Sequence, residues 1–232
     1  MDEKALTHLR QAPPDVAEAA LKRAIAERYR QSLYQTCKSL LGYADITWRT
    51  HGPVIEALEN AEPNKLIVMP RGTFKSTISV VGYSIWRLIR DPNERLLIDS
   101  EVYTNSKNFL REIKGHLESP RVSGLFGVFR GAQWTEGEIT IAQRTKVHKE
   151  ASITCGGIET VKVGQHYSVI IEDDLNSGNN SQTVEGRQKV IRHHQMNTAI
   201  LDPGGTLVVV GTRYAVDDIC GFILENEMGI KQ

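Results

Sequence analysis

The sequence lacks an excess of charge of either sign, because 28 lysine and arginine residues balance 28 aspartate and glutamate residues. No block of like charges runs through it, so composition alone points to neither a nucleic-acid nor a membrane partner. A nucleic-acid face, if present, must be local. The sequence also lacks an apolar run of about 18 residues, so we expect no membrane-spanning helix, and its polar N-terminus does not resemble a signal peptide.

Cysteine is scarce: the three residues are far apart, and no two of them form a C-x-x-C pair (Cys37, Cys155 and Cys220). This pattern favours neither a zinc site nor a disulfide framework, and it fits a reducing intracellular compartment. We do not expect His193 and His194 to bind a metal. Adjacent residues on a helix point about 100° apart, and no third ligand is placed beside them.

The N-terminal part of the sequence has a helical pattern. Apolar residues recur every fourth position over residues 15–41, which predicts one long helix with a capping box at Asp15 and Glu18. A second amphipathic helix is expected over 52–60. The length of 232 residues suits one main domain with a small appendage. We therefore expect a helical subdomain over 1–45 and a core domain over 46–232.

After Pro63 the pattern changes to short apolar runs rich in valine and isoleucine, which are typical of strands covered on both faces in a parallel sheet. Strands are predicted over 66–68, 95–99, 152–154, 167–171 and 206–210, and helices over 75–89, 105–118 and 184–199. Trp86 is expected in the core. The predicted fold class is a three-layer α/β core with a mainly parallel central sheet and a helical N-terminal appendage.

The segment LIVMPRGTFKSTI, residues 66–78, has the order strand, turn, helix. Such a turn points backbone N–H groups and the positive end of the helix dipole at one anion. Lys75 would then reach the β- and γ-phosphates of a nucleotide, and the Ser76 hydroxyl would ligate Mg²⁺. Phe74, however, stands where the pattern G-x-x-x-x-G-K-[ST] has its second glycine. An ordinary turn with a solvated Lys75 is the alternative.

The segment YSVIIEDDL supplies the acids that a nucleotide hydrolase needs, one to hold Mg²⁺ and another to orient the attacking water. We assign Asp173 to the metal and Asp174 to the water, while Glu172 is a further catalytic candidate. If the strand continues, alternation puts Glu172 and Asp174 on the same side. The presence of both loop and acids favours a P-loop ATPase, with ATP and Mg²⁺ as ligands, over a solvated acidic turn.

A third buried strand, GGTLVVVGTRY, ends in Thr212 and Arg213. A polar side chain at the tip of a strand beside the acidic one can sense the γ-phosphate. The alternative is a strand end that leads into the N-terminus of a helix at Asp217 and Asp218.

Three segments in this order, MPRGTFKST, GQHYSVIIEDDL and LDPGGTLVVVGTRYAVDDICGFIL, resemble the ATPase domain of the large terminase subunit of tailed bacteriophages, a DNA-packaging motor. The resemblance spans about residues 48–224. It implies a RecA/ASCE-like P-loop fold, a Walker B pair at Asp173 and Asp174, a coupling residue at Thr212, and an adenine-side segment with Trp48 and His51. It also implies a deviant Walker A loop, in which Arg71 lies four residues before the lysine and the second glycine is dispensable (Pro70, Arg71, Gly72, Thr73, Phe74, Lys75, Ser76 and Thr77).

The resemblance further implies hydrolysis of Mg-ATP coupled to translocation of double-stranded DNA into a procapsid, in the cytoplasm of an infected bacterium. The implied partners are a portal protein, a small terminase subunit and further copies of the chain in a ring. A neighbouring copy would complete the site with a cation, for which the candidates are Arg121, Arg130, Arg144 and Lys162. Large terminases continue into a nuclease domain; this sequence ends at Gln232, so we do not expect DNA cleavage from it.

Two basic segments, RTKVHK at 144–149 and GRQKVIRHH at 186–194, are candidate DNA contacts, and both are equally typical of solvated faces. The alternatives of other classes are another P-loop DNA-translocating or helicase-like ATPase, a non-catalytic nucleotide-binding packaging adaptor, and a small-molecule P-loop kinase.

Overall fold

The computed structural model of the chain describes residues 13–160 and 164–228. Its centre is a seven-stranded sheet with the strand order β1-β7-β6-β2-β5-β4-β3. The strands β1, β7, β6, β2 and β5 run parallel, while β4 and β3 are antiparallel additions at one edge. Their bounds are Asn64–Val68 for β1, Leu96–Ser100 for β2, Arg130–Trp134 for β3, Glu138–Ile141 for β4, Ile153–Gly157 for β5, Tyr167–Asp173 for β6 and Leu201–Gly211 for β7.

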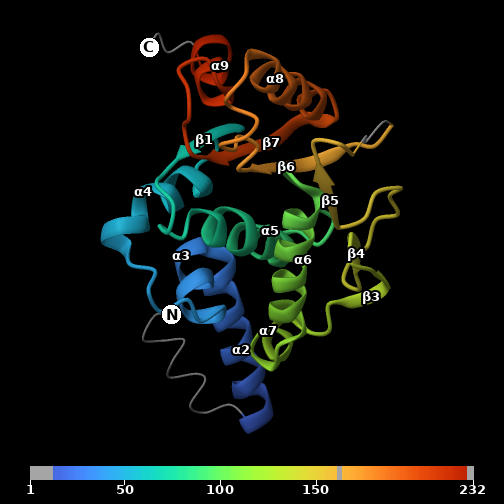
Figure 1. Cartoon of the computed structure of the whole chain (residues 1–232). Helices are drawn as coiled ribbons and strands as arrows, with labels where there is room; N and C mark the ends of the chain where they lie inside the picture. The colour runs from blue at the N-terminus through green and yellow to red at the C-terminus, as the bar shows by residue number, and fades with distance from the viewer. Residues whose placement is uncertain (1–12, 161–163, 229–232) are drawn as a thin grey trace.

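Helices cover both faces of this sheet, so the molecule has three layers (Figure 1). Helices α8 and α9 pack on one face, and α4, η2, α5 and α6 pack on the other, with α2, α3, η1 and α7 outside them. The predicted fold class is confirmed. The bounds are Pro14–Gln31 for α2, Leu33–Gln35 for α3, Thr36–Leu40 for η1, Trp48–Glu59 for α4, Thr77–Gly82 for η2, Tyr83–Arg90 for α5, Tyr103–Glu118 for α6, Pro120–Phe126 for α7, Val184–Ala199 for α8 and Ile219–Asn226 for α9.

The central strands read as apolar runs because both of their faces are buried. In β2, Leu97 contacts the core under α8 and α9, whereas Ile98 belongs to the larger core on the other face. In β6, Ile170 and Ile171 divide in the same way. This alternation decides which side of the sheet each polar residue at a strand end can reach.

The single helix predicted over 15–41 is wrong, because the chain is extended at Ser32 (φ −141°). The Ser32 hydroxyl accepts a hydrogen bond from the Gln35 N–H at 3.2 Å and so begins a new helix, as serine favours at an N-cap. The predicted capping box is also wrong: α2 starts after Pro13 without a side-chain cap. The residues after the break share the core with η2 and α5 (Leu33, Cys37 and Leu40).

Three elements have no counterpart among the predicted ones: β3, β4 and α7. β3 has the sequence RGAQW and is nowhere fully buried, so it lacks the apolar run by which the central strands are recognised. α4 begins at Trp48, four residues before the predicted start, and runs through Pro53. The other predicted helices are confirmed: 75–89 corresponds to the continuous helix through η2 and α5, 105–118 to α6, and 184–199 to α8.

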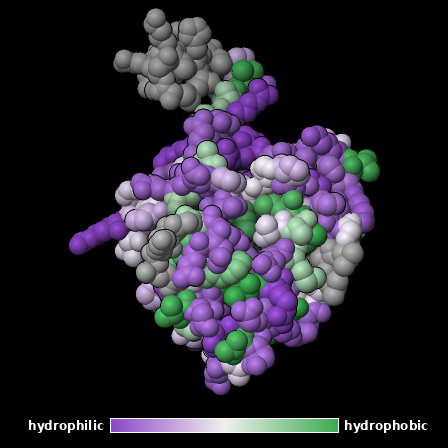
Figure 2. Space-filling view, turned by 90° about the horizontal axis from the view of Figure 1, so that it is seen from above, coloured by the Kyte–Doolittle hydropathy of each residue, from purple (hydrophilic) through white to green (hydrophobic). Residues whose placement is uncertain are grey.

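Hydrophobic residues on the face shown in Figure 2 form small patches among hydrophilic ones. Within the described ranges, no helix combines the length and the apolar composition needed to cross a membrane.

A buried polar network holds α8 on the sheet. His193 Nε2 lies 2.6 Å from Asp99 Oδ2, and His194 Nδ1 lies 2.6 Å from Glu172 Oε2. The Asn197 amide donates to both carboxylates, at 2.7 and 2.8 Å. The second ring nitrogen of His194 lies 2.9 Å from Glu227 Oε1, so the ring faces a carboxylate on each side, which requires both nitrogens to be protonated.

The network predicts a pH dependence of stability. Burial disfavours the charge, but Glu172 and Glu227 outweigh it and raise the pKa of His194 from 6.5 to about 10. A raised folded-state pKa contributes stability that is complete below pH 6.5 and is lost as the pH rises through about 10. Below pH 6.5, His194→Gln should therefore lower the free energy of unfolding by about 3–5 kcal/mol, the cost of breaking a buried ion pair.

The measurement is urea unfolding of the wild type and His194→Gln between pH 6 and 10. The difference between the two should shrink as the pH rises; a constant difference would contradict the charged ring. His116→Gln is the control, because burial lowers the pKa of His116 and its effect should not change above pH 7.

A second prediction concerns Gly82, where η2 meets η1. A Cβ at this position would overlap the sulfur of the fully buried Cys37. Gly82→Ala should therefore destabilise the fold by about 1–3 kcal/mol through overpacking. Gly115→Ala on α6, where a Cβ meets nothing within 4 Å, should stabilise it by about 0.5–1 kcal/mol. Chemical denaturation checks both. In a Cys37→Ala background Gly82→Ala should cost less, and an equal cost would refute the overlap.

Candidate functional site

The loop between β1 and the next helix turns through two residues with positive φ, Gly72 at 76° and Phe74 at 56°. Phe74, which stands at the second glycine of the nucleotide-loop pattern, thus keeps the backbone conformation that glycine adopts easily and a bulky residue rarely does. Its ring packs edge-on against His51, with centroids 5.8 Å apart. The side chain therefore contributes packing at a position where the backbone is strained.

Lys75 is the first helical residue after the loop and is 5% exposed. Its ammonium donates to both carboxylate oxygens of Asp174 at 2.7 Å and lies 3.5 Å from the Thr212 hydroxyl. The Thr212 hydroxyl also donates to the Met69 carbonyl at 3.4 Å. The ends of β1, β6 and β7 therefore meet around one lysine.

Ser76 and Asp173 form a second pair, in which the hydroxyl donates to Asp173 Oδ1 at 2.7 Å. Asp173 is buried, and burial raises its pKa to about 6 against the opposing hydrogen bond from Ser76. A hydroxyl and a carboxylate oxygen in contact are ligands of the kind that Mg²⁺ prefers. The donor set fits the metal that the sequence predicts for these two residues.

The two acids at the end of β6 reach Ser76 and Lys75, respectively, because the strand ends between them. Asp173 is the last residue of β6, and its side chain is on the face of Ile171, toward η2. Asp174 follows with φ 44°, while its N–H donates to the Val210 carbonyl at 2.8 Å. This left-handed residue breaks the strand alternation and turns the Asp174 carboxylate back to Lys75.

Glu172 is separated from this group, contrary to the prediction that it shares a side with Asp174. It points to the opposite face of the sheet, where it is fully buried and bonded to His194 and Asn197. The prediction assumed a strand that continues past Asp173, and the positive φ of Asp174 removes that assumption.

Arg71 contacts Tyr214, a residue that the sequence reasoning did not single out. The guanidinium donates to the Tyr214 hydroxyl and lies 5.9 Å from the centre of its ring. The one sequence feature that could have indicated this contact is the aromatic residue directly after Thr212 and Arg213. A shallow pocket is lined by the predicted loop and one acid (Arg71, Gly72, Thr73, Phe74, Lys75, Ser76, Thr77 and Asp174), and Pro70 adjoins it through its carbonyl, which accepts from the Thr73 hydroxyl at 2.7 Å.

Of the two candidates for the adenine side, His51 reaches the loop and Trp48 does not. His51 is buried, contacts Phe74 and lies within hydrogen-bond distance of the Thr47 backbone. Trp48 is half exposed and packs edge-on against Tyr34, with centroids 5.4 Å apart. His51 is therefore close enough to act at the loop. Trp48 lies on the neighbouring surface and does not contact the loop.

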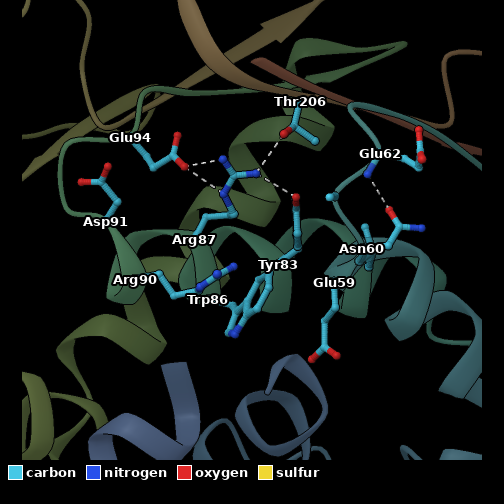
Figure 3. Close-up of a pocket in the computed structure, with 12 residues that line it drawn as sticks. Glu59, Asn60, Glu62, Tyr83, Trp86, Arg87, Arg90, Asp91, Glu94 and Thr206 are labelled. Atoms are coloured by element: carbon cyan, nitrogen blue, oxygen red, sulfur yellow. Dashed lines mark hydrogen bonds and ion pairs between the residues drawn. The ribbon is translucent and has the colours of Figure 1, made fainter. Parts of the chain in front are cut away.

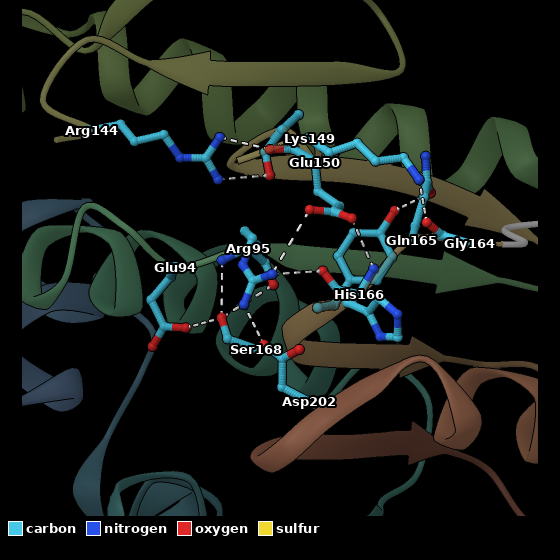
Figure 4. Close-up of polar contacts among 12 residues, drawn as sticks. Glu94, Arg95, Arg144, Lys149, Glu150, Gly164, Gln165, His166, Ser168 and Asp202 are labelled. Atoms are coloured by element: carbon cyan, nitrogen blue, oxygen red, sulfur yellow. Dashed lines mark hydrogen bonds and ion pairs between the residues drawn. The ribbon is translucent and has the colours of Figure 1, made fainter. Parts of the chain in front are cut away.

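The candidate cations for a neighbouring subunit's site differ in what they contact. Arg144 donates to the carbonyls of Glu150 and Ala151 at 2.6 and 3.3 Å (Figure 4). Arg130 pairs with Glu118 at 3.0 Å on the surface, and Arg121 donates to the Ser39 carbonyl at 3.3 Å. Lys162 lies outside the described residues. Arg144 thus braces its own loop, which leaves Arg121 and Arg130 as the exposed candidates.

The two predicted DNA-contact segments are partly engaged within the protein. Lys149 donates to the Gly164 carbonyl (Figure 4). In the second segment, Arg187 pairs with Asp217 and Lys189 with Glu159, while His193 and His194 lie on the buried face of α8. The two ion pairs offset part of the positive charge of the second segment, and the carbonyl occupies one donor of Lys149 in the first.

A larger pocket lies away from the carboxyl ends of the strands, between the end of α4, α5 and Thr206 of β7 (Figure 3). Its Arg87 is already bonded to Glu94, Tyr83 and Thr206, and Trp86 belongs to the core as predicted. Ligands of parallel α/β sheets bind beyond the carboxyl ends of the strands. The pocket at the loop, although smaller, is therefore the candidate functional site.

Comparison of the sequence with protein-family models gives no match, and comparison with curated proteins gives none either. Among solved structures, the chain is similar to the large terminase of bacteriophage HK97, with a TM-score of 0.57 and 12% sequence identity over 88% of this chain. The similar region is 41% of that terminase chain. The chain therefore has the α/β fold of part of a phage large terminase.

Proposed function

We propose that this chain is the ATPase motor domain of a phage terminase large subunit, which couples Mg-ATP hydrolysis to translocation of double-stranded DNA into a procapsid. One observation carries the proposal: Lys75–Asp174 and Ser76–Asp173 are hydrogen-bonded pairs whose members lie 99 and 97 positions apart in the sequence. They bring a lysine suited to phosphate, a hydroxyl suited to a metal and two carboxylates to the carboxyl ends of the central strands. The fold that carries them is similar to part of a large terminase.

The loop residues would bind the triphosphate. Gly72 leaves open space beside the backbone, and the helix that starts at Lys75 directs its positive end at the loop. The Lys75 ammonium, now shared by the two oxygens of Asp174, would turn to the β- and γ-phosphates, and Arg71 would leave Tyr214 to add a second cation. Both cations would offset the negative charge that the transferring phosphoryl group carries.

Ser76 and Asp173 would hold Mg²⁺, which supplies further charge neutralisation at the phosphate oxygens. Once Lys75 has turned to phosphate, the Asp174 carboxylate is free to accept a hydrogen bond from the attacking water and hold it in line. Thr212 would lose its contact with Lys75 in the same rearrangement. Because Thr212 follows β7, it would pass this change to the strand between β1 and β6.

We also propose a homo-oligomeric ring at a portal protein, supplied with DNA by a small terminase subunit, with Arg121 or Arg130 of one copy completing the site of the next. Another P-loop DNA translocase or helicase-like ATPase would share the site, and a nucleotide-binding packaging adaptor would share the loop without turnover. Turnover separates the adaptor from the ATPases, and its dependence on protein concentration tests for a site completed by a neighbour.

The proposal predicts Mg²⁺-dependent ATP hydrolysis that rises faster than linearly with protein concentration, because the neighbour supplies a cation. Lys75→Ala and Asp173→Asn should each lower turnover by about 10²–10³-fold, the usual cost of removing one charge-stabilising group. Phosphate release, with and without linear duplex DNA, measures this. Matched controls are Lys22→Ala on α2 and Asp45→Asn, both exposed.

Wild-type protein that neither hydrolyses nor binds Mg-ATP at any concentration would refute the ATPase. Binding without turnover, lost in Lys75→Ala, would favour the adaptor. Turnover that is strictly linear in concentration would count against a site completed by a neighbour.

A further inference from the structure

A groove runs between α6 and the turn that joins β3 to β4, two elements that lie side by side in Figure 1. Five of its lining residues come from α6 at spacings of three and four, so they share one helix face, and the sixth comes from the turn (Thr104, Lys107, Asn108, Arg111, Lys114 and Glu136). The groove lies outside both of the basic segments that the sequence suggested.

The groove has an excess of positive charge. Lys107 lies 3.3 Å from the Glu136 carboxylate, but the Glu136 side chain is 87% exposed, and such pairs are weak in water. Arg111 donates to the side-chain oxygen of Asn108 at 2.9 Å, and Lys114 donates to the Thr135 carbonyl at 3.2 Å. Across residues 13–160 and 164–228, no ion pair neutralises Arg111 or Lys114. Three cations therefore face one exposed carboxylate.

Aromatic rings hold the two outer cations in place. The ammonium of Lys107 lies 5.4 Å from the centre of the Tyr103 ring, and that of Lys114 lies 5.8 Å from the centre of the Trp134 ring. From residue 107 to residue 114 an α-helix rises about 10 Å. A row of cations of this length, flanked by the polar side chains of Thr104 and Asn108, suits an extended polyanion better than a single small anion.

We propose that this groove binds the phosphodiester backbone of duplex DNA, with Lys107, Arg111 and Lys114 against successive phosphates. The choice of DNA rests on the proposed function; the charge and shape of the groove do not. In the segment at 186–194, Arg187 and Lys189 pair with carboxylates, which offset their charge more than the neutral partners of Arg111 and Lys114 do.

The groove is also connected to the candidate ATPase site. α6 starts at Tyr103, three residues after β2 ends at Ser100, and Ser100 is the register partner of Asp173 in β6. β2 lies three strands from β1, a distance of about 14 Å across the sheet. DNA bound along α6 would therefore contact the helix that follows β2, the strand beside the proposed metal ligand Asp173.

The test is fluorescence anisotropy of a short labelled duplex DNA of mixed sequence, without nucleotide, over about 50–200 mM salt. The slope of log affinity against log salt should fall by about 0.9 for each lost phosphate contact. Lys107→Gln/Arg111→Gln/Lys114→Gln should thus lower it by about 2.7, and Arg111→Gln alone by about 0.9. Arg111→Lys should retain it, and Glu136→Gln, which removes the one carboxylate, should tighten binding.

Two controls remove exposed cations elsewhere: Lys146→Gln/Lys149→Gln and Lys189→Gln/Arg192→Gln. DNA-free ATP turnover of every variant is measured in parallel, and urea unfolding confirms that each is folded. The groove variants should lose DNA binding and keep that turnover. If the wild type binds DNA and turns over no ATP, loss of binding in the groove variants would still support the groove, while the ATPase proposal would fail.

Three outcomes would overturn the groove as a DNA site: no DNA binding by the wild type, unchanged binding by the triple variant, or a greater loss in either control than in the triple variant. Unchanged DNA binding together with lost binding of an acidic protein would assign the groove to a protein partner instead.

Discussion

Two hydrogen-bonded pairs, Lys75 with Asp174 and Ser76 with Asp173, join the start of the helix after β1 to the end of β6. β1 and β6 are not neighbours; β7 lies between them, and its register aligns Val68 with Gly211 and Asp173 with Val210. Because all three strands are parallel, their carboxyl ends stop at one edge. The adjacent Lys75 and Ser76 can then meet the adjacent Asp173 and Asp174.

The backbone completes this arrangement at a cost. Phe74 and Asp174 are the non-glycine residues with positive φ in the described part of the chain, and both lie in the site. Residues in such conformations cost about 1–3 kcal/mol each and persist where the surroundings fix them. Contact with His51 holds the Phe74 ring, while Lys75 and the Val210 carbonyl hold Asp174. The strain places the lysine and the second carboxylate within bonding distance.

The sequence was sufficient for what depends on periodicity and chain order. Continuous apolar runs located five strands, and polar residues at three strand ends located Lys75, Asp173 and Thr212, which the structure brings together. The sequence was not sufficient where one backbone angle, or a few side-chain hydrogen bonds, determine which way a residue points. Nothing in the letters EDD shows that Asp174 leaves the strand, so the sequence does not reveal that Glu172 and Asp174 lie on opposite sides of the sheet. Nor does β3 have a burial pattern that distinguishes it from a loop.

The alternation along β6 gives adjacent residues separate tasks. Asp173 faces the loop after β1, while Glu172 faces α8 and forms a buried polar cluster with Asp99, His194 and Asn197. β2 repeats this division, because Asp99 is the register partner of Glu172, and Ser100 of Asp173. A buried charged cluster is costly to break, so α8 is fixed to the two strands behind the site. α8 is bonded to β6 through Glu172 and to β2 through Asp99, and α6 follows β2, so both helices are linked to strands that end beside Asp173.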